Sequence, residues 1–392
     1  MKKNLFRLGA FLLALFMLST AVFALPAEEP SAETAIEPVV DSLKLPAKSA
    51  ILIEQTTGQV LYAQNPDERL PIASVTKVMT LLLTMEALSQ GIIHLEDAVP
   101  ISETAASQGG SQVFLEPGEH ITLHEVLKAV FVSSANDGAV ALAELISGSV
   151  DAFVAAMNDR AAALGMHDTV FCNPTGLDDN DTGLSTARDV AIMSRALLAF
   201  EEIYPYTTIW TDSIRDGAFG LANTNKLVRF YSGATGLKTG STSKAKFCVS
   251  ASAERAGLKL CAVVLAGETS KDRFQAARTM LDWGFANFAY YTPEEASLSP
   301  IPVWGGTEGE VSVKAALSGM LLPKTDAMGV TSQVILDPEL SAPVEAGQRV
   351  GCIRYLKGDA ILYEEPVVTE CAVPRLTLWQ IFCRLLSCSL FG

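Results

Sequence analysis

The chain has 392 residues, of which 49% are hydrophobic and 19% are charged. This length and composition predict one to three folded domains and exclude a disordered or collagen-like chain. The formal net charge is −15, from 29 Lys and Arg residues against 44 Asp and Glu residues, and the sequence contains no long basic run. Because such a chain is repelled by a phosphate backbone, we expect no nucleic-acid partner.

The N-terminus has the pattern of a signal peptide over residues 1–24. Three basic residues precede an apolar run at residues 8–18, and small residues occupy the positions before a cleavage site after Ala24. A retained membrane anchor is the alternative, but the apolar run is short for a membrane span. We therefore expect an exported protein.

Residues 25–47 are rich in Pro, Glu and Ala and predict a flexible leader. Ordered structure is expected from residue 48, where two short apolar runs on either side of Thr57-Gly58, at residues 50–54 and 60–63, predict a β-hairpin. Stretches with helical periodicity follow at residues 74–90, 123–133, 139–146, 152–164 and 187–198. Strands at residues 246–253 and 259–266 and a helix at residues 271–288 complete an α/β or α+β domain over residues 48–290.

Residues 291–373 have a different pattern, with short alternating runs separated by Gly, Pro and Asp. The runs are at residues 311–315, 334–336, 350–355 and 361–363. Short alternating runs are typical of strands in a small sandwich, so we expect a second, all-β domain.

The C-terminal residues 375–392 predict an amphipathic helix. Polar residues recur three or four positions apart, and the positions between them are almost all apolar, including Trp379 and Phe382. A helix of this length is too short for a hydrocarbon core of roughly 30 Å, but it can lie in the membrane surface. A helix packed on its own protein is the alternative.

A candidate nucleophile and its base stand at the start of the first long helical stretch. Ser74 and Lys77 are three residues apart, so on a helix they share a face and the amine lies beside the hydroxyl. A serine needs a base to act as a nucleophile, and a desolvated lysine near another cation can lose its proton at neutral pH. The pattern alone is weak, because Ser-x-x-Lys occurs again at Ser241–Lys244.

Two further motifs strengthen this hypothesis. Ser134-Ala-Asn136 is the only Ser-x-Asn in the sequence and lies between two predicted helices, and Lys238-Thr-Gly240 is the only Lys-Thr-Gly and leads into a predicted strand. The three motifs, in this order, are characteristic of penicillin-binding proteins and class A β-lactamases. On a chain expected to be exported, the three motifs together specifically indicate this group of enzymes.

The sequence resembles the low-molecular-mass penicillin-binding proteins, specifically the serine-type D-alanyl-D-alanine carboxypeptidases. The likeness covers about residues 48–391, including the domain order, and further stretches that carry it are Glu116–Gly118, Ser134–Asp137, Asn173–Asp178, Ser185–Asp189 and Gly236–Gly240. It implies a penicillin-binding/β-lactamase-like transpeptidase fold followed by the β-sandwich domain and the amphipathic helix. It also implies a peptidoglycan stem peptide as substrate, acylation by β-lactams, no cofactor and no metal.

The resemblance also implies residue roles and a location. Ser74 would attack the carbonyl of the penultimate D-alanine and become acylated, and Lys77 would be the general base. Ser134 and Asn136 would relay protons and hold the substrate amide. The enzyme would sit at the outer face of the cytoplasmic membrane, facing the cell wall and peripherally anchored by residues 375–392.

The resemblance assigns substrate binding to the third motif and to an arginine after it. Lys238 would supply positive potential, and the backbone N–H groups of Ser74 and of Ser241, which follows Gly240, would form the oxyanion hole. Arg273, assisted by Thr239, is the candidate for the terminal carboxylate of the substrate. A surface residue at the start of a helix is the alternative interpretation of Arg273.

One stretch departs from the family pattern, and three other functions compete with the carboxypeptidase hypothesis. Lys246 stands where the family often has glycine, which would alter access to the site or substrate preference but leave the nucleophile unchanged. A class A β-lactamase also needs a Glu-x-x-x-Asn pattern between the second and third motifs, and no glutamate there fits it. Endopeptidase or transpeptidase activity on cross-links, and non-catalytic binding of wall peptides, remain alternatives.

Overall fold

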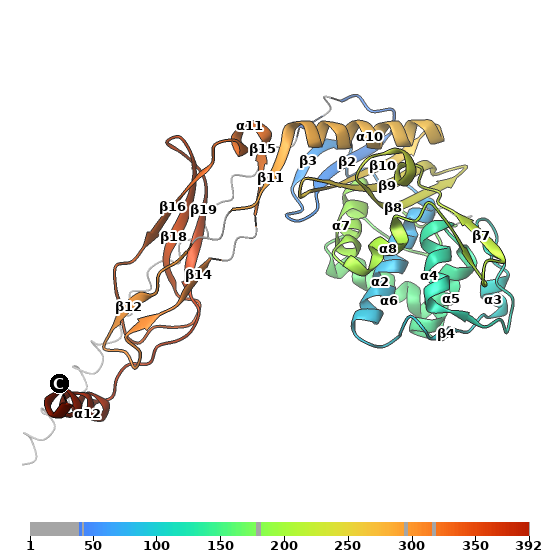
Figure 1. Cartoon of the computed structure of the whole chain (residues 1–392). Coiled ribbons are helices and arrows are strands. Elements are labelled where there is room, and N and C mark those ends of the chain that lie inside the picture. The colour runs from blue at the N-terminus through green and yellow to red at the C-terminus, as the bar shows by residue number, and fades with distance from the viewer. Residues whose placement is uncertain (1–38, 41–42, 178–181, 294–296, 316–318, 392) are drawn as a thin grey trace, which may run out of the picture. The chain divides into compact units, whose positions relative to one another are not determined.

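The computed structural model describes residues 39–40, 43–177, 182–293, 297–315 and 319–391 (Figure 1). The predicted signal peptide at residues 1–24, and most of the predicted leader at residues 25–47, lie outside the described residues. A mixed sheet-and-helix part is followed along the chain by an all-β part and a terminal helix.

A six-stranded sheet is the framework of the first part. Its strand order is β1, β3, β2, β10, β9, β8, with bounds Val39–Val40, Val60–Gln64, Ser49–Glu54, Leu258–Gly267, Lys246–Arg255 and Ala234–Thr242. The short β1 runs parallel to β3, and the other neighbouring pairs are antiparallel. The predicted hairpin (β2–β3) and the predicted strands β9 and β10 are confirmed. The edge strand β8, which contains Lys238-Thr-Gly240, was not predicted, because its glycines interrupt the strand pattern.

Both faces of the sheet are covered, which explains why all six residues of β2 are buried. Ile51 and Ile53 belong to one core cluster with α2 (Lys77–Ser89) and α7 (Ala187–Leu198). Ala50 and Leu52 belong to another with α10 (Ser270–Asn287). This alternation follows from the period of two in a strand. Figure 1 shows α10 along one side of the sheet and α2 and α7 on the opposite side.

The predicted helices are present, and all but α7 have ends shifted by one to three residues. α4 (Leu123–Val132), α6 (Val150–Ala163), α7 and α10 each follow a Ser or Thr whose hydroxyl accepts a hydrogen bond from a first-turn N–H. These caps satisfy N–H groups that lack a partner within the helix. The stretch predicted as one helix over residues 74–90 begins with a 3-10 turn, η1 (Ala73–Thr76), before α2. α5 (Asn136–Ser147) begins at the Ser-x-Asn motif, earlier than predicted.

Several short elements were not predicted, because three or four residues are too few to show a period. They are α3 (Glu103–Ala106), η2 (Glu201–Ile203), α8 (Tyr204–Thr207) and α9 (Leu227–Phe230), with the antiparallel strand pair β4–β5 (Ala98–Val99 and Ile121–Thr122) and the hairpin β6–β7 (Thr211–Ile214 and Phe219–Ala222). α9 packs beside β8 and therefore borders the strand that holds the third motif.

The all-β part has two sheets around one core. A three-stranded sheet has the order β13, β12, β17 (Glu310–Val311, Ile301–Trp304, Leu340–Ser341) and a four-stranded sheet the order β14, β19, β18, β16 (Val313–Ala315, Ala360–Thr369, Arg349–Lys357, Thr331–Leu336). Buried residues from both sheets, such as Val303 and Ile353, form a single core cluster. The predicted all-β domain is confirmed. β11 (Phe288–Tyr291), which pairs with β15 (Met320–Pro323), spans the predicted boundary at residues 290 and 291.

The described chain ends in helix α12 (Leu378–Phe391), after the short α11 (Lys324–Ala327). α12 lies within the predicted amphipathic segment at residues 375–392. Over the described ranges, no single helix has both the length and the apolar character needed to cross a membrane. The pair α5 and α6, bent by 84° at its break, meets those two criteria only when taken together.

Candidate active site

The first motif lies where the 3-10 turn passes into α2. Ser74 is in η1, Lys77 begins α2, and the Lys77 Nζ is 3.1 Å from the Ser74 Oγ. The residue before the serine, Ala73, has φ of 48°, in the left-handed region that residues with a Cβ seldom adopt. Such a conformation persists only where the surrounding structure holds it, so the turn that presents Ser74 depends on its neighbours.

The amine of Lys77 is fully buried and is held by acceptors from separate segments of the chain. Its Nζ is 2.5 Å from the Asn136 Oδ1 and 2.8 Å from the Thr175 carbonyl oxygen, in addition to the Ser74 Oγ. Burial lowers the pKa of Lys77 well below its usual value, the charge of Lys238 lowers it further, and Asp137 opposes both effects. A neutral amine is therefore favoured at this position.

The second motif connects α4 to α5. Ser134 has φ of 62°, and Asn136 is the first residue of α5. The Asn136 side chain is fixed at both ends, because its Oδ1 accepts from Lys77 and its Nδ2 donates to the Gly109 carbonyl oxygen at 2.6 Å. Its backbone N–H donates to the Ser111 carbonyl oxygen at 2.7 Å. The amide is thus held in one orientation beside the Lys77 amine.

The third motif brings a second buried amine to the site from β8. The Lys238 Nζ donates to the Ser134 Oγ at 2.7 Å and to the Thr239 carbonyl oxygen at 3.0 Å. Burial, together with the charge of Arg273, lowers the pKa of Lys238 to about 7. All three motifs therefore meet in space, with Ser74 and Ser134 each hydrogen-bonded to a lysine.

Two glycines allow the surrounding chain to approach the Ser74 turn. A Cβ on Gly240 would lie 2.6 Å from the Ile72 carbonyl oxygen and 2.9 Å from the Ser74 backbone nitrogen. A Cβ on Gly176, which has φ of 75°, would lie 1.9 Å from the Ala73 carbonyl oxygen. Neither position has room for a side chain. β8 and the loop around Gly176 therefore pack directly against the turn that carries the serine.

The remaining residues of the third motif lie along the same strand. The Thr239 Oγ1 donates to the Thr224 Oγ1 at 2.7 Å. Ser241 follows Gly240 in β8 and its side chain is exposed, opposite Phe247 of β9 in the sheet register. The backbone of Ser241 therefore lies one residue beyond the close contact between Gly240 and the Ser74 turn.

Arg273 is a buried residue of α10 that reaches back to the same strand. Its Nη1 donates to the carbonyl oxygens of Gly240 at 3.0 Å and Cys248 at 3.3 Å, whereas its buried Nε has no hydrogen-bond partner. Burial lowers the pKa of Arg273 to about 10. The interpretation of Arg273 as a surface residue is thus wrong, because its side chain lies behind the third motif with an unpaired donor.

Three contributors to the site were not assigned from the sequence. Asp137 is buried and accepts hydrogen bonds from the backbone N–H groups of Val113 and Leu115, at 3.0 and 3.1 Å. Thr175 supplies a carbonyl oxygen to Lys77, and Thr224 supplies a hydroxyl to Thr239. Asp137 and Thr175 lie within stretches that resemble the family, but a backbone oxygen leaves no residue-specific mark in a sequence.

The second Ser-x-x-Lys match and the family departure have structural explanations. Ser241–Lys244 spans the end of β8 and the following turn, not a helix, so its residues are not presented as Ser74 and Lys77 are. Lys246 has φ of 57°, in the left-handed region that glycine adopts without steric cost, so this position would also suit the glycine expected from the resemblance. Its side chain is exposed and its Nζ lies 3.5 Å from Glu268.

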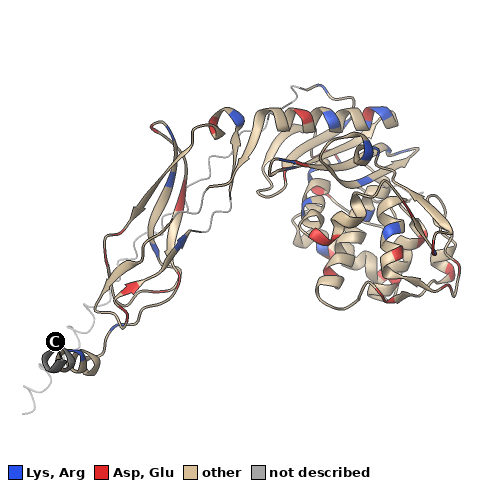
Figure 2. Cartoon of the chain, in the orientation of Figure 1, with Lys and Arg blue, Asp and Glu red and all other residues tan. Residues whose placement is uncertain are grey.

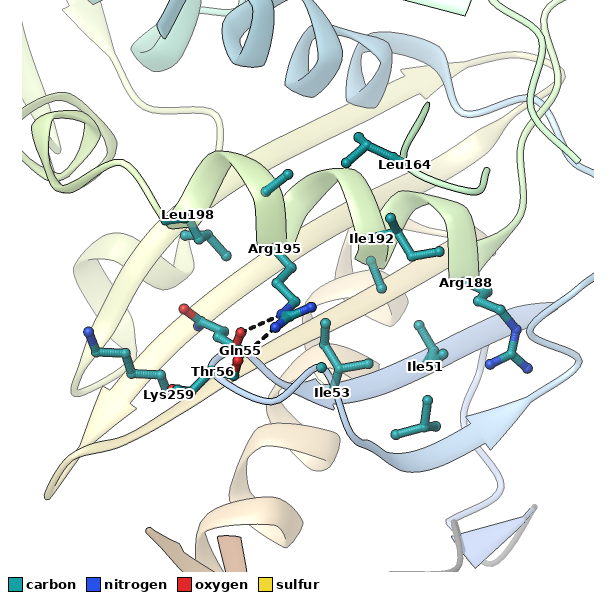
Figure 3. A pocket seen from close by; sticks show the side chains of 15 residues that line it. Ile51, Ile53, Gln55, Thr56, Leu164, Arg188, Ile192, Arg195, Leu198 and Lys259 are labelled. Atoms are coloured by element: carbon teal, nitrogen blue, oxygen red, sulfur yellow. Dashed lines mark hydrogen bonds between the residues drawn. The ribbon is translucent and has the colours of Figure 1, made fainter. Parts of the chain in front are cut away.

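A separate cavity lies between α7 and the β2–β3 hairpin (Figure 3). It measures about 580 Å³, and Ile51, Ile53 and Ile192 line it. None of the candidate site residues contributes to it. Within the part of the chain that the structure describes, no group of His, Cys, Asp and Glu side chains could hold a metal ion.

The site geometry agrees with the family matches. Residues 33–269 match the D-alanyl-D-alanine carboxypeptidase family, and residues 291–375 match the C-terminal domain of penicillin-binding protein 5. The chain belongs to the D-alanyl-D-alanine carboxypeptidase family. It is 41% identical over 331 residues to the D-alanyl-D-alanine carboxypeptidase DacF of Bacillus subtilis, covering 83% of this chain and 85% of the relative.

Solved structures of family members agree with the fold. Penicillin-binding protein 5 from Haemophilus influenzae is 31% identical, with a TM-score of 0.73, over 87% of this chain and 100% of that chain. Penicillin-binding protein D2 from Listeria monocytogenes, solved with ampicillin bound, is 30% identical, with a TM-score of 0.57, over 62% of this chain and 98% of that chain. The predictions of a penicillin-binding fold and of a serine carboxypeptidase are confirmed.

The buried amines predict a pH-dependent stability. Between about pH 7 and the usual lysine pKa of 10.5, Lys238 is neutral in the folded carboxypeptidase and protonated in the unfolded chain. Because the unfolded state binds more protons in this window, the free energy of unfolding gains a contribution that grows as the pH rises and is lost as it falls towards 7. Urea unfolding at pH 7 and pH 9 should show a smaller rise for Lys238→Met than for the wild type. An equal rise in both would contradict the depressed pKa.

Proposed function

We propose that Ser74 is the nucleophile of this D-alanyl-D-alanine carboxypeptidase, and that it removes the terminal D-alanine from peptidoglycan stem pentapeptides. The observation that carries the proposal is the burial of the Lys77 amine, whose hydrogen-bond partners among the described residues are all neutral, 3.1 Å from the Ser74 hydroxyl. A lysine in such an environment is a general base at neutral pH.

The hydrogen bonds of Lys77 support its role as the base. A neutral amine has two N–H donors and one lone pair. The Asn136 Oδ1 and the Thr175 carbonyl oxygen accept hydrogen bonds and have no proton to give, so they engage the two N–H groups. The lone pair is then left for the Ser74 hydroxyl. As the Ser74 oxygen bonds to the carbonyl carbon, its proton passes to the Lys77 amine.

Ser134 is the proposed route by which a proton reaches the leaving group. It accepts a hydrogen bond from the Lys238 Nζ, so its own hydroxyl hydrogen is free to point to the departing nitrogen. When the peptide C–N bond breaks, the Ser134 hydroxyl proton passes to the departing nitrogen, and the proton that Lys77 took from Ser74 replaces it on Ser134. D-alanine leaves with its amine protonated, Ser74 remains acylated, and Lys77 is neutral again. Water then hydrolyses the ester and restores Ser74. The Asn136 amide keeps Lys77 in place and holds the substrate amide.

The close packing at Gly240 supports an oxyanion hole formed by the backbone N–H groups of Ser74 and Ser241. Gly240 brings β8 so near the Ser74 turn that no side chain fits between them. Two N–H groups held by a rigid turn and a sheet strand can stabilise the developing charge without reorganisation. The carbonyl of a β-lactam meets the same groups, so we propose that β-lactams acylate Ser74 as the peptide does.

The terminal carboxylate of the substrate needs a cation on this acidic chain, and we assign it to Lys238, Arg273 and the Thr239 hydroxyl. Arg273 is buried, braced against two carbonyl oxygens, and has an unpaired Nε donor. A buried N–H donor without a partner lowers the stability of the fold. A substrate carboxylate bound nearby would offset the positive charge of the buried Arg273 guanidinium. Lys238 contributes when it is protonated, near its pKa of about 7.

We further propose that α12 holds the enzyme at the membrane surface after export. Large apolar side chains of the helix are exposed, including Leu378 at 87%, Trp379 at 71% and Leu385 at 67%. The polar side of the helix contacts the all-β part, because the Arg384 Nη2 donates to the Thr307 carbonyl oxygen at 2.5 Å. A helix of 14 residues is about 21 Å long and therefore lies in the interface without crossing it. The predicted signal peptide would place the enzyme on the outer face, facing the wall.

The role of Ser74 as the nucleophile can be tested on the reaction itself. The wild-type chain should release D-alanine from a pentapeptide ending in D-Ala-D-Ala and should form a stable adduct with a labelled penicillin. Ser74→Ala removes the attacking oxygen, so release should fall by at least about a thousandfold and the adduct should disappear. D-alanine assay and gel fluorescence measure the two. Release that survives in Ser74→Ala would contradict the assignment, and an adduct without release in the wild type would favour an enzyme directed at cross-links.

Substitution of Arg273 tests whether this residue binds the terminal carboxylate of the substrate. Arg273→Ala should raise the KM for the pentapeptide by roughly 10- to 100-fold, because one charge-assisted interaction contributes about 1.5–3 kcal/mol. Arg273→Lys should recover part of the loss. The penicillin adduct, measured at saturating label, serves as the control that the site still folds. An unchanged KM in a folded Arg273→Ala enzyme would remove this residue from substrate binding.

Vesicle flotation tests whether α12 anchors the enzyme at a membrane surface. With residues 1–24 removed from every variant, the chain should float with phospholipid vesicles, and deletion of residues 378–391 should abolish flotation. Replacing Trp379 and Leu385 by Ser should weaken vesicle binding by roughly tenfold or more per residue, since each buried apolar side chain contributes about 1.5–3 kcal/mol. Replacing Ile361, an exposed residue of the β domain, is the matched control. Flotation that persists without α12 would show that the helix is not the anchor.

A further inference from the structure

A second hollow, of about 520 Å³, lies between α9 and the first turns of α10. Three cations line it, Lys226, Lys271 and Arg278, together with the rings of Phe230 and Phe274. No Asp or Glu is among its lining residues. On a chain with a formal net charge of −15 this is an unusual local excess of positive charge. The basic and acidic positions are interspersed elsewhere along the described chain (Figure 2).

The charges of the hollow are not neutralised from its surroundings. Among the described residues, neither Lys226 nor Lys271 forms an ion pair, and both side chains are exposed. The neighbouring carboxylate of Asp272 is occupied, because it accepts hydrogen bonds from the backbone N–H and the hydroxyl of Thr269 in the helix cap. The two lysines are therefore available to an anion from solution, and Arg278, whose Nη2 donates to the Phe230 carbonyl oxygen at 3.5 Å, lies beside them.

The hollow borders the proposed carboxylate site through shared residues. The Phe274 ring, which lines the hollow, lies 4.7 Å from the Arg273 guanidinium carbon. The Ser270 hydroxyl, which also lines it, is 3.5 Å from the Arg273 Nη2. On the other wall of the hollow, Lys226 comes directly after Thr224 and Asn225 in the chain. The Thr224 hydroxyl is hydrogen-bonded to the Thr239 hydroxyl, and the Asn225 side-chain amide donates to the Gly236 carbonyl oxygen at 2.9 Å. The hollow therefore lies beside the proposed carboxylate site.

We propose that this hollow binds free carboxylates of the peptidoglycan substrate beyond its D-Ala-D-Ala end, and so retains the anionic polymer at the active site. The inference rests on the proposed function. Peptidoglycan carries carboxylates on its stem peptides, and an enzyme with excess negative charge repels such a polymer except where cations are clustered. The exposed Phe230 and the half-buried Phe274 provide apolar surface beside the cations, against which the substrate backbone packs.

The test compares a polymeric substrate with a minimal one. The polymer is purified peptidoglycan rich in pentapeptide and freed of attached phosphate polymers, and the minimal substrate is a diacylated Lys-D-Ala-D-Ala tripeptide, whose terminal carboxylate is its only one. The variant is Lys226→Ala with Lys271→Ala. The control is Lys44→Ala with Lys314→Ala, which removes the same charge from two exposed lysines outside the hollow.

The hollow variant should lose about tenfold or more in kcat/KM on the polymer while changing less than twofold on the tripeptide. The control variant should keep wild-type values on both, and raised salt should weaken the wild type, but not the hollow variant, on the polymer. Equal values for the two double variants on the polymer would overturn the proposal. Equal losses on both substrates would also overturn it, because the lysines would then act on the site itself.

A binding measurement separates this inference from the proposed function. Ser74→Ala should sediment with insoluble peptidoglycan, and adding the two hollow substitutions should release most of it into the supernatant. Retention that is insensitive to Lys226 and Lys271 would overturn the carboxylate site whatever the activity. Failure of the wild type to release D-alanine from the tripeptide would instead contradict the proposed function alone.

Discussion

The site depends on burying the Lys77 amine without a carboxylate partner. Desolvation would make this position unfavourable for a charged lysine, so the structure supplies neutral acceptors instead, from Asn136 and Thr175. Those acceptors come from the start of α5 and from the loop before α7, and the amine itself comes from the start of α2. Three separate segments must therefore converge within hydrogen-bond distance of one atom. The 3-10 turn, the glycine contacts and the left-handed Ala73 all follow from fitting Ser74 into this arrangement.

Much of the fold was predictable, because the covered sheet and the long helices carry their own periodicity. β2 alternates between two cores, and α7 has the same bounds as its predicted segment. Helix geometry paired Ser74 with Lys77, and the family resemblance predicted that Ser134, Asn136 and Lys238 join them in one site. The features that were not predicted, β8 and Thr175, leave no periodic pattern in the sequence. The edge strand β8 lacks a strand pattern because close contact with the Ser74 turn requires Gly240. Thr175 acts through its backbone, which any residue type would provide.

The charges are distributed unevenly with respect to the site. The chain is acidic as a whole, yet the residues that meet behind the serine include Lys77, Lys238 and Arg273, all buried. Mutual repulsion and desolvation act in the same direction on the two lysines, which favours the neutral base. Arg273 cannot respond in this way, because a guanidinium stays protonated at working pH even when burial lowers its pKa to about 10. One group can thus become a base while its neighbour remains a permanent cation.

The strand that carries the third motif is also the last strand of its sheet. An open sheet edge invites pairing with any extended chain and is a common origin of aggregation. Here Asn225 covers the edge at the Gly236 carbonyl oxygen, and Thr224 engages the Thr239 hydroxyl. The covering shortens the length of β8 that another strand could use. Two residues that flank the site therefore also reduce the part of the β8 edge that is open to pairing with another chain.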